Sequence, residues 1–381
     1  ATGGAIIAGQ YLGRRRSDRA AYSGRQLLLF LGEVSLGVTA LFYLGRGFIL
    51  HVVFGEVAAD VAAYANTYFL IVEASTPFLA LYSGGAALFR VMGSSRVSMW
   101  IAALMTVINA AGNWILIFGL HMGVAGSAIS TLAARIVAAV LILLLLRRPG
   151  LPIRVETLTL HHDRYVIRNI LRYGVPNGLE SCMFQLGKIL LLSTVAALGT
   201  ASVAANAIGN TLCALQCVPG NALGLAMITV ISRCVGAGGY DRARQYVKKL
   251  MKSAYLYMGG AILLILALLP WILRLYSVSA QAEEYARQIV RIHGLFGAAL
   301  WPAAFVLPQA LRAAGDIRYT MVVSTLSMWL VRVALGVLLV RLWGFGVLGI
   351  WLSMFADWAV RIAFFLPRFR GRRWEAGALR D

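Results

Sequence analysis

Four acidic residues stand inside long apolar stretches of this 381-residue sequence: Glu33, Glu73, Glu180 and Asp357. Three basic residues stand in similar stretches: Arg135, Lys188 and Arg332. Charges held in apolar surroundings are costly, so they usually face a cavity or a charged partner, and they often mark ion or proton pathways. These residues therefore predict the binding of ions or charged molecules. Glu73 lies close to one end of its stretch and is expected to be interfacial.

Glu180 follows a proline in the segment YGVPNGLE, residues 173–180. Pro176 has no N–H to donate, so inside a helix it leaves a carbonyl one turn back free to bind a cation or water. A buried carboxylate near that carbonyl could exchange a proton or a cation. We predict that Glu180 and Asn177 take part in ion binding. The alternative is a structural acid whose partner is Asn177 or a neighbouring helix.

Arg332 and Asp357 form the clearest candidate pair in the second half of the chain. Counted from the nearest flanking arginines at about 1.5 Å per helical residue, the two charges lie at similar depths, roughly 21 and 16 Å from the same side. The connection between their stretches is short, so the two helices are expected to be antiparallel neighbours. We predict a direct Arg332–Asp357 ion pair, either structural or functional. Glu33 and Arg135 are the corresponding candidates in the first half.

The apolar stretches are long enough to cross a membrane. Hydrophobic residues make up 60% of the sequence and charged residues only 13%, against about 25% charged in soluble domains. A spanning helix needs about 20 mostly apolar residues. Residues 1–11 resemble the last turns of a further helix rather than a signal peptide. The sequence thus predicts an all-α membrane protein with ten spans, near 27–50, 63–89, 97–120, 122–146, 168–198, 201–232, 247–273, 285–311, 319–342 and 345–366.

The formal net charge of +20 is distributed very unevenly between the connections. Of the 35 Lys and Arg residues, 27 fall in or beside one alternating set of connections and only five in the other. Basic residues gather on the cytoplasmic side of membrane proteins. The larger set and the C-terminus are therefore predicted to be cytoplasmic. The positive charge then needs no nucleic-acid partner to explain it, and the expected surroundings are a lipid bilayer.

Three loops occur twice in the chain, in the same order and with a nearly constant separation between the copies. GRRRSDRA returns as GAGGYDRA, RVMGSSRVSM returns as RAAGDIRYTM, and GVAG returns as GVLG; the pairs begin at positions 13 and 236, 90 and 312, and 123 and 346. Each copy occupies the same place between helices that run in the same direction. This pattern predicts two six-helix bundles, the first of them incomplete in this chain, related by a parallel internal duplication with an axis along the membrane normal and alternating access as the motion.

The repeat also predicts domain boundaries. Residues 1–148 form a first lobe, which begins roughly one and a half helices later than the second lobe does. Residues 149–165 form a polar cytoplasmic linker, and residues 166–381 form the second lobe with a basic C-terminal tail.

The loop motifs, taken together and in this order, resemble one known family. They are G-A-G-G-Y-D-R-A-R at 236–244, the two R-x-x-G-x-x-R-x-x-M loops, N-x-x-x-N-W-I-L-I-F-G at 109–119, which includes Asn113, and G-V-A-G-S-A-I-S at 123–130. The set is similar to the multidrug and toxic compound extrusion (MATE) transporters over essentially the whole chain, without roughly the first one and a half helices. In well-known branches of that family an acid stands one turn after Glu180, where this sequence has Phe184.

The resemblance implies a monomeric transporter in a bacterial plasma (inner) membrane. It would export organic cations or amphipathic drugs by antiport, with Na⁺ or H⁺ as the coupling ion and without a cofactor. The candidate binding residues for substrate or ion are Glu180, Asn177, Asp357, Arg332, Glu33, Arg135 and Asn113.

Two alternatives are weighed against this expectation. A lipid-linked oligosaccharide flippase of the same superfamily would share the architecture, but usually carries more basic residues in its cavity than Arg135, Lys188 and Arg332. A membrane-embedded enzyme would need convergent catalytic groups, and the sequence offers none. The four cysteines and the His161-His162 pair lack the spacing of a metal site. We therefore predict neither catalysis nor a bound metal.

Overall fold

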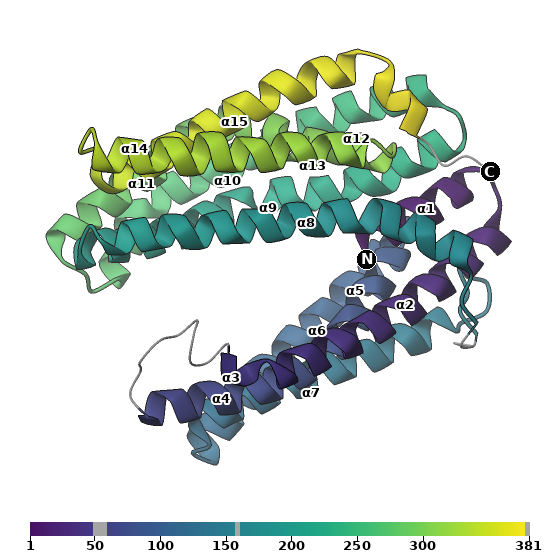
Figure 1. Ribbon diagram of the computed structural model, residues 1–381, viewed down its shortest axis with the longest axis horizontal. Helices are drawn as coiled ribbons and strands as arrows, with labels where there is room; N and C mark the ends of the chain where they lie inside the picture. Colours follow the sequence, from purple (N-terminus) through teal and green to yellow (C-terminus); the bar gives the residue numbers. More distant parts are fainter. Residues whose placement is uncertain (49–58, 157–160, 378–381) are drawn as a thin grey trace. The chain divides into compact units, whose positions relative to one another are not determined.

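The computed structural model describes residues 1–48, 59–156 and 161–377, and all regular structure in those ranges is helical (Figure 1). The chain divides into two compact units, Ala1–Gly174 and Val175–Asp381. The boundary between them falls within one long helix, α8 (Arg164–Ala196).

The first unit is a bundle in which α2 packs against α1 and α5, and α7 packs against α4, α5 and α6. Its most buried element is the glycine-rich α1, where every residue from Gly3 to Tyr11 is buried. The elements before α8 are α1 (Thr2–Gly13), α2 (Ser17–Leu44), α3 (Arg46–Phe48), α4 (Ala59–Ala74), α5 (Thr76–Val91), α6 (Ser95–Asn113), the π-helical η2 (Trp114–Gly119) and α7 (Gly123–Leu146).

The segment 149–165, expected as a linker, packs within the first unit. Ile153 and Val155 are buried. The side-chain amide of Gln26 in α2 donates to the carbonyl of His161 at 2.6 Å. His162 Nε2 lies 2.7 Å from the Glu33 carboxylate, also in α2. These contacts pack both described parts of the segment, 149–156 and 161–165, against the first unit.

The second unit is built around α9, which packs against α10, α11 and α12. Two of its spans are interrupted by π-helical turns, which widen the helix locally and occur often at functional sites. Its elements after α8 are α9 (Thr200–Gly236), α10 (Tyr240–Leu275), α11 (Ala280–Trp301), η3 (Pro302–Val306), α12 (Leu307–Ala313), α13 (Ile317–Leu326), η4 (Ser327–Val333), α14 (Ala334–Arg341), α15 (Gly346–Arg370) and the short 3₁₀ turn η5 (Arg373–Gly377).

The described ranges contain nine helices that are long and apolar enough to cross a membrane. A tenth results if α4 and α5, which meet at a bend of 41°, count as one span. Each of these ten segments overlaps one of the ten predicted from the apolar stretches, and the prediction of an all-α membrane fold is confirmed. The largest difference is in the first span: α2 begins at Ser17, ten residues before the predicted start, and residues 49 and 50 of the predicted span lie outside the described residues.

Equivalent turns in the two units have the same backbone conformation. Arg15, after α1, and Gly238, after α9, both have positive φ, 60° and 71°. Each donates its N–H to the carbonyl three residues back, and the next N–H bonds five residues back. This is the Schellman pattern that ends many helices. Gly93 and Gly315, which follow α5 and α12, repeat it with φ of 88° and 99°.

The last helical hairpin of each unit is matched as well. A Cβ atom added at Gly126 in α7 would lie 2.9 Å from the Cβ of Leu116, and one at Gly349 in α15 would lie 3.0 Å from the Cβ of Leu339. Both glycines therefore permit the same close approach of two helical segments. These matched positions have the same separation along the chain as the repeated loops, which agrees with the predicted duplication.

Candidate substrate and ion-binding site

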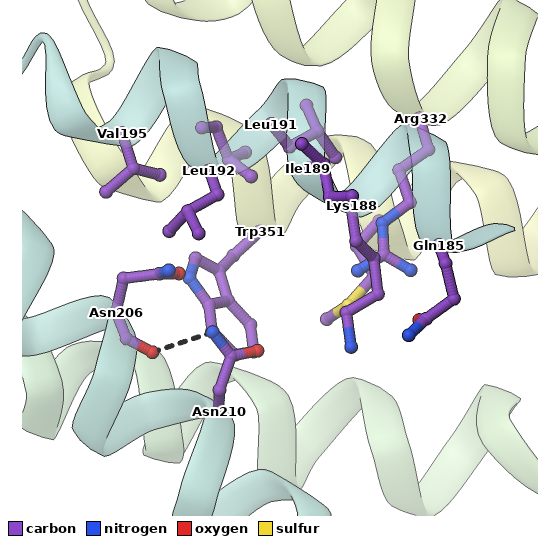
Figure 2. Close-up of a pocket in the computed structure, with 12 residues that line it drawn as sticks. Gln185, Lys188, Ile189, Leu191, Leu192, Val195, Asn206, Asn210, Arg332 and Trp351 are labelled. Atoms are coloured by element: carbon purple, nitrogen blue, oxygen red, sulfur yellow. Dashed lines mark hydrogen bonds between the residues drawn. The ribbon is translucent and has the colours of Figure 1, made fainter. Parts of the chain in front are cut away.

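A cavity of about 390 Å³ lies within the second unit, between α8, α9, η4 and α15 (Figure 2). Small-molecule sites typically occupy about 300–1,000 Å³. The lining combines two cationic side chains, three amides, one indole and six aliphatic or thioether groups. It consists of Gln185, Lys188, Ile189, Leu191, Leu192, Val195, Asn206, Asn210, Arg332, Ile350, Trp351 and Met354.

Helical spacing brings the polar lining residues to this cavity. Gln185, Lys188 and Leu192 are three and four residues apart, so they share one face of α8. Asn206 and Asn210 are four residues apart on α9, and the side-chain amide of Asn210 donates to the carbonyl of Asn206 at 2.8 Å. Two amides one helical turn apart thus lie on the cavity side of α9.

Arg332 belongs to the π-helical turn η4, and its guanidinium lies 5.4 Å from the centre of the Phe184 ring. The described residues include no carboxylate within ion-pair distance of Arg332 or Lys188. Phe184, which stands where the family resemblance placed an acid, therefore meets the positive charge with the face of an aromatic ring.

Asp357 is completely buried in α15, and its partner is Arg361 rather than Arg332. Arg361 Nε donates to Asp357 Oδ1 at 2.9 Å, and the Ser327 hydroxyl donates to the same oxygen at 2.5 Å. The predicted direct Arg332–Asp357 pair is therefore wrong. Arg361 is one turn further along α15, and side chains of a helix lean toward its N-terminus, so its guanidinium reaches back to Asp357.

Arg361 is itself held from several sides. It donates to the carbonyl of Ser324 at 3.2 Å, and its guanidinium lies 5.1 Å from the centre of the Phe305 ring and 5.9 Å from that of Phe184. The other carboxylate oxygen of Asp357, Oδ2, is buried without a hydrogen-bond partner among the described residues. One oxygen of this acid remains available to a proton or a small cation.

Glu180 in α8 pairs with Arg312 in α12, with 2.5 Å between Oε1 and Nη2. The side chains are only 13% and 10% exposed. The second oxygen, Oε2, is buried and has no hydrogen-bond partner in the part of the chain that the structure describes. Sequence reasoning missed Arg312 because it opens the R-x-x-G-x-x-R loop and was counted among the flanking charges. Asn177 accepts the Ser181 hydroxyl at its backbone carbonyl, 3.0 Å away.

A buried histidine behind the cavity was also missed. His293 in α11 shares a hydrogen bond of 2.5 Å between Nδ1 and the side-chain oxygen of Gln216. Its ring meets Trp351 and Trp358 edge-on, with centroid distances of 5.9 and 5.4 Å. Because Trp351 also lines the cavity, His293 and Gln216 help to fix one wall of it. His293 stands alone in its part of the sequence and belongs to no motif that would indicate this role.

The three candidates in the first unit have separate partners. Glu33 contacts His162, as described above. Arg135 in α7 donates to the hydroxyl of Ser75, at the bend between α4 and α5, at 2.5 Å. Asn113 at the end of α6 accepts the Ser130 hydroxyl at 2.6 Å. Their roles in binding, like those of the candidates in the second unit, stay predictions.

Membrane-length helices, a set of buried charges and a cavity of small-molecule size together define a multi-pass membrane transporter. Comparison with known sequences agrees with this class. The chain belongs to the MatE family, whose sequence model matches residues 1–115 and 176–338.

Two relatives and one solved structure illustrate the relationship. The uncharacterized transporter YisQ of Bacillus subtilis (strain 168) is 26% identical over 388 residues, covering 98% of this chain and 82% of the relative. The probable multidrug resistance protein NorM of Thermotoga maritima is 23% identical over 373 residues, covering 96% and 79%.

The solved structure is the outward-facing conformation of a multidrug resistance MATE family transporter of the MOP superfamily. It covers 98% of this chain, and this chain spans 84% of it, with a TM-score of 0.86 and 18% identity. That likeness shows the fold.

Proposed function

We propose that the protein exports organic cations or other amphipathic compounds by antiport with Na⁺ or H⁺, through alternating access between its two lobes. The relatives described as probable multidrug resistance proteins support this proposal. The proposed setting is a bacterial plasma membrane, with a monomeric protein whose C-terminus faces the cytoplasm. We propose no cofactor; Na⁺ or H⁺ would act as the coupling ion. A lipid-linked oligosaccharide flippase is not favoured, because the related proteins are MATE multidrug transporters.

The observation that carries the proposal is the Glu180–Arg312 pair. It joins α8 to the end of α12, while Glu180 Oε2 remains buried and without a partner among the described residues. A proton or Na⁺ bound to this carboxylate would reduce its charge and weaken its attraction to Arg312. Ion binding would thereby loosen a contact between two membrane-spanning helices. This links the occupancy of one carboxylate to a change in helix packing, as antiport requires.

Glu180 is the proposed coupling acid, and Asp357 is a second ion-binding candidate in the same unit. Competition between ion and substrate follows from charge: a cationic substrate near a neutralised Glu180 loses its attraction and is released. Asn177, Arg332, Glu33, Arg135 and Asn113 remain the further candidates for contacts with substrate or ion.

The test measures efflux of a fluorescent organic cation into everted membrane vesicles that contain the full-length protein. A Na⁺ gradient and a pH gradient are imposed separately, to identify the coupling ion. Glu180→Gln should abolish gradient-driven transport at unchanged expression. Glu284→Gln, which removes an exposed carboxylate from α11, is the control and should transport normally. Wild-type transport by Glu180→Gln would place the coupling acid elsewhere.

A further inference from the structure

We propose that the cavity of the second unit binds an organic anion. Lys188 and Arg332 would receive its sulfonate, carboxylate or phosphate group, and the apolar lining would hold its aromatic or aliphatic body. This adds acidic amphipathic compounds to the substrates of the proposed exporter, beside the organic cations that Glu180 would attract outside this cavity, and it rests on that function only for transport. Binding itself is independent of it and can be measured without a gradient.

The two cations of the cavity lie together and lack a counter-charge. Figure 2 shows the side chains of Lys188 and Arg332 on one side of the cavity, beside Gln185. Both side chains line the same cavity, so their like charges repel each other. The described lining contains no carboxylate that could offset them. A bound anion would remove this repulsion and would supply both cations with a partner.

The buried carboxylate of Asp357 in the same unit cannot take the place of that anion. Asp357 makes no ion pair with Arg332 among the described residues, and its Oδ1 is held directly by Arg361 and Ser327. The single negative charge of Asp357 is therefore outnumbered by the three positive charges of Lys188, Arg332 and Arg361. The local excess of positive charge favours a negatively charged ligand over a cation.

The rest of the lining suits a small amphipathic ligand. Asn206, Asn210 and Trp351 lie across the cavity from the two cations (Figure 2). The Nε1 donor of Trp351 is buried and has no acceptor among the described residues. Leucine, isoleucine and valine side chains from α8 complete an apolar wall. A volume of about 390 Å³ accommodates one or two rings with an acidic group, and excludes a lipid-linked oligosaccharide.

The experiment compares two probes that share one aromatic body, naphthalene-1-sulfonate and 1-naphthyltrimethylammonium. Each is titrated calorimetrically into the purified full-length protein in neutral detergent. The sulfonate should bind at least tenfold more tightly than the ammonium. Lys188→Gln and Arg332→Gln should each weaken sulfonate binding at least tenfold. Arg341→Gln, which removes an exposed arginine at the end of α14, is the matched control and should bind as the wild type does.

Equal binding of the two probes would overturn the proposal, and so would unchanged sulfonate binding in Lys188→Gln. Lys188 is exposed, so that variant remains informative even if Arg332→Gln does not fold. Lys188→Glu should reverse the preference toward the ammonium probe.

Two further measurements identify the source of the anion and distinguish anion binding from transport. In nanodiscs, displacement of the sulfonate by phosphatidylglycerol but not by phosphatidylcholine would identify an anionic lipid headgroup as the occupant. The absence of displacement would identify a soluble anion. Glu180→Gln should keep sulfonate binding even where it loses transport, because Glu180 does not line this cavity. Failure of antiport and failure of anion binding are thus distinguishable.

Discussion

Asp357 has one oxygen in an ion pair with Arg361, and the two side chains are almost completely buried. Removing one partner of such a pair leaves an uncompensated charge, which costs about 3–5 kcal/mol, whereas replacing both by apolar groups is often close to neutral. We therefore expect Asp357→Ala to lower the free energy of unfolding by several kcal/mol. The double variant Asp357→Leu/Arg361→Met should recover most of the loss. Denaturant unfolding in detergent micelles measures both effects.

A matched double variant tests whether Arg361 is the specific partner. Asp357→Leu/Arg332→Met leaves Arg361 buried and unpaired, so it should be as unstable as a single Asp357 variant. If this variant were the more stable of the two doubles, Arg332 would be the dominant partner of Asp357, and the assignment from the 2.9 Å contact would be refuted.

The sequence identified the buried acids but not their partners. Glu180 and Asp357 stand out because a carboxylate in an apolar stretch is rare whatever the fold. Their partners depend on which way a side chain leans and on differences of one helical turn, about 5.4 Å. Counting depth from flanking arginines does not resolve such differences. It also assigned Arg312 and Arg361 to the flanks of their helices, where basic residues are common, although both lie inside the bundle.

Among the elements, the turn after α1 offers a direct test of the duplication. Arg15 adopts φ of 60°, a conformation that costs an L-residue about 1–2 kcal/mol, whereas its equivalent in the second unit is Gly238. The Arg15 side chain is exposed. Arg15→Gly should therefore stabilise the protein by up to about 1 kcal/mol, and Gly238→Ala should destabilise it by a similar amount. Thermal unfolding in detergent gives the sign of each change.

Arg15→Ala is the matched control, since it removes the same charge but keeps a Cβ atom. Arg15→Ala should not stabilise the protein, because alanine is strained at a positive φ just as arginine is. If Arg15→Ala stabilised the protein as much as Arg15→Gly, the effect would arise from charge repulsion among the neighbouring arginines. The positive φ would then carry little energy at this turn.

Most helices could be predicted from the sequence, whereas their irregularities could not. Runs of about 20 apolar residues reveal a spanning helix regardless of its neighbours. Helix ends were less accurate: α9 continues to Gly236, beyond the predicted 232, because its charged end remains helical. The π-helical turns and the 41° bend at Ser75 depend on packing between helices. Such packing leaves no periodic signal in one sequence.

For the whole molecule, the duplicated turns and the distribution of charge lead to one topology. The turn at Arg15 recurs at Gly238, and the turn at Gly93 recurs at Gly315, with the same hydrogen bonds and a nearly constant separation. An inverted repeat would place equivalent turns on opposite sides of the membrane, whereas a parallel repeat places them on the same side. Basic residues remain concentrated in one alternating set of connections even when the buried Arg312 and Arg361 are left out. Both copies of each turn lie in this basic set, so the turns and the charges together favour parallel copies.

Cysteine labelling decides between these topologies. In a background with the four native cysteines replaced by alanine, single cysteines are introduced at two exposed and equivalent pairs, Arg19 with Arg242 and Met122 with Phe345. A membrane-impermeant maleimide should label the first pair only in everted vesicles and the second pair only in intact cells. This result follows because basic connections stay in the cytoplasm and both copies run in the same direction. Labelling of Arg19→Cys and Arg242→Cys from opposite sides would show that the halves are inverted, despite their matching turns.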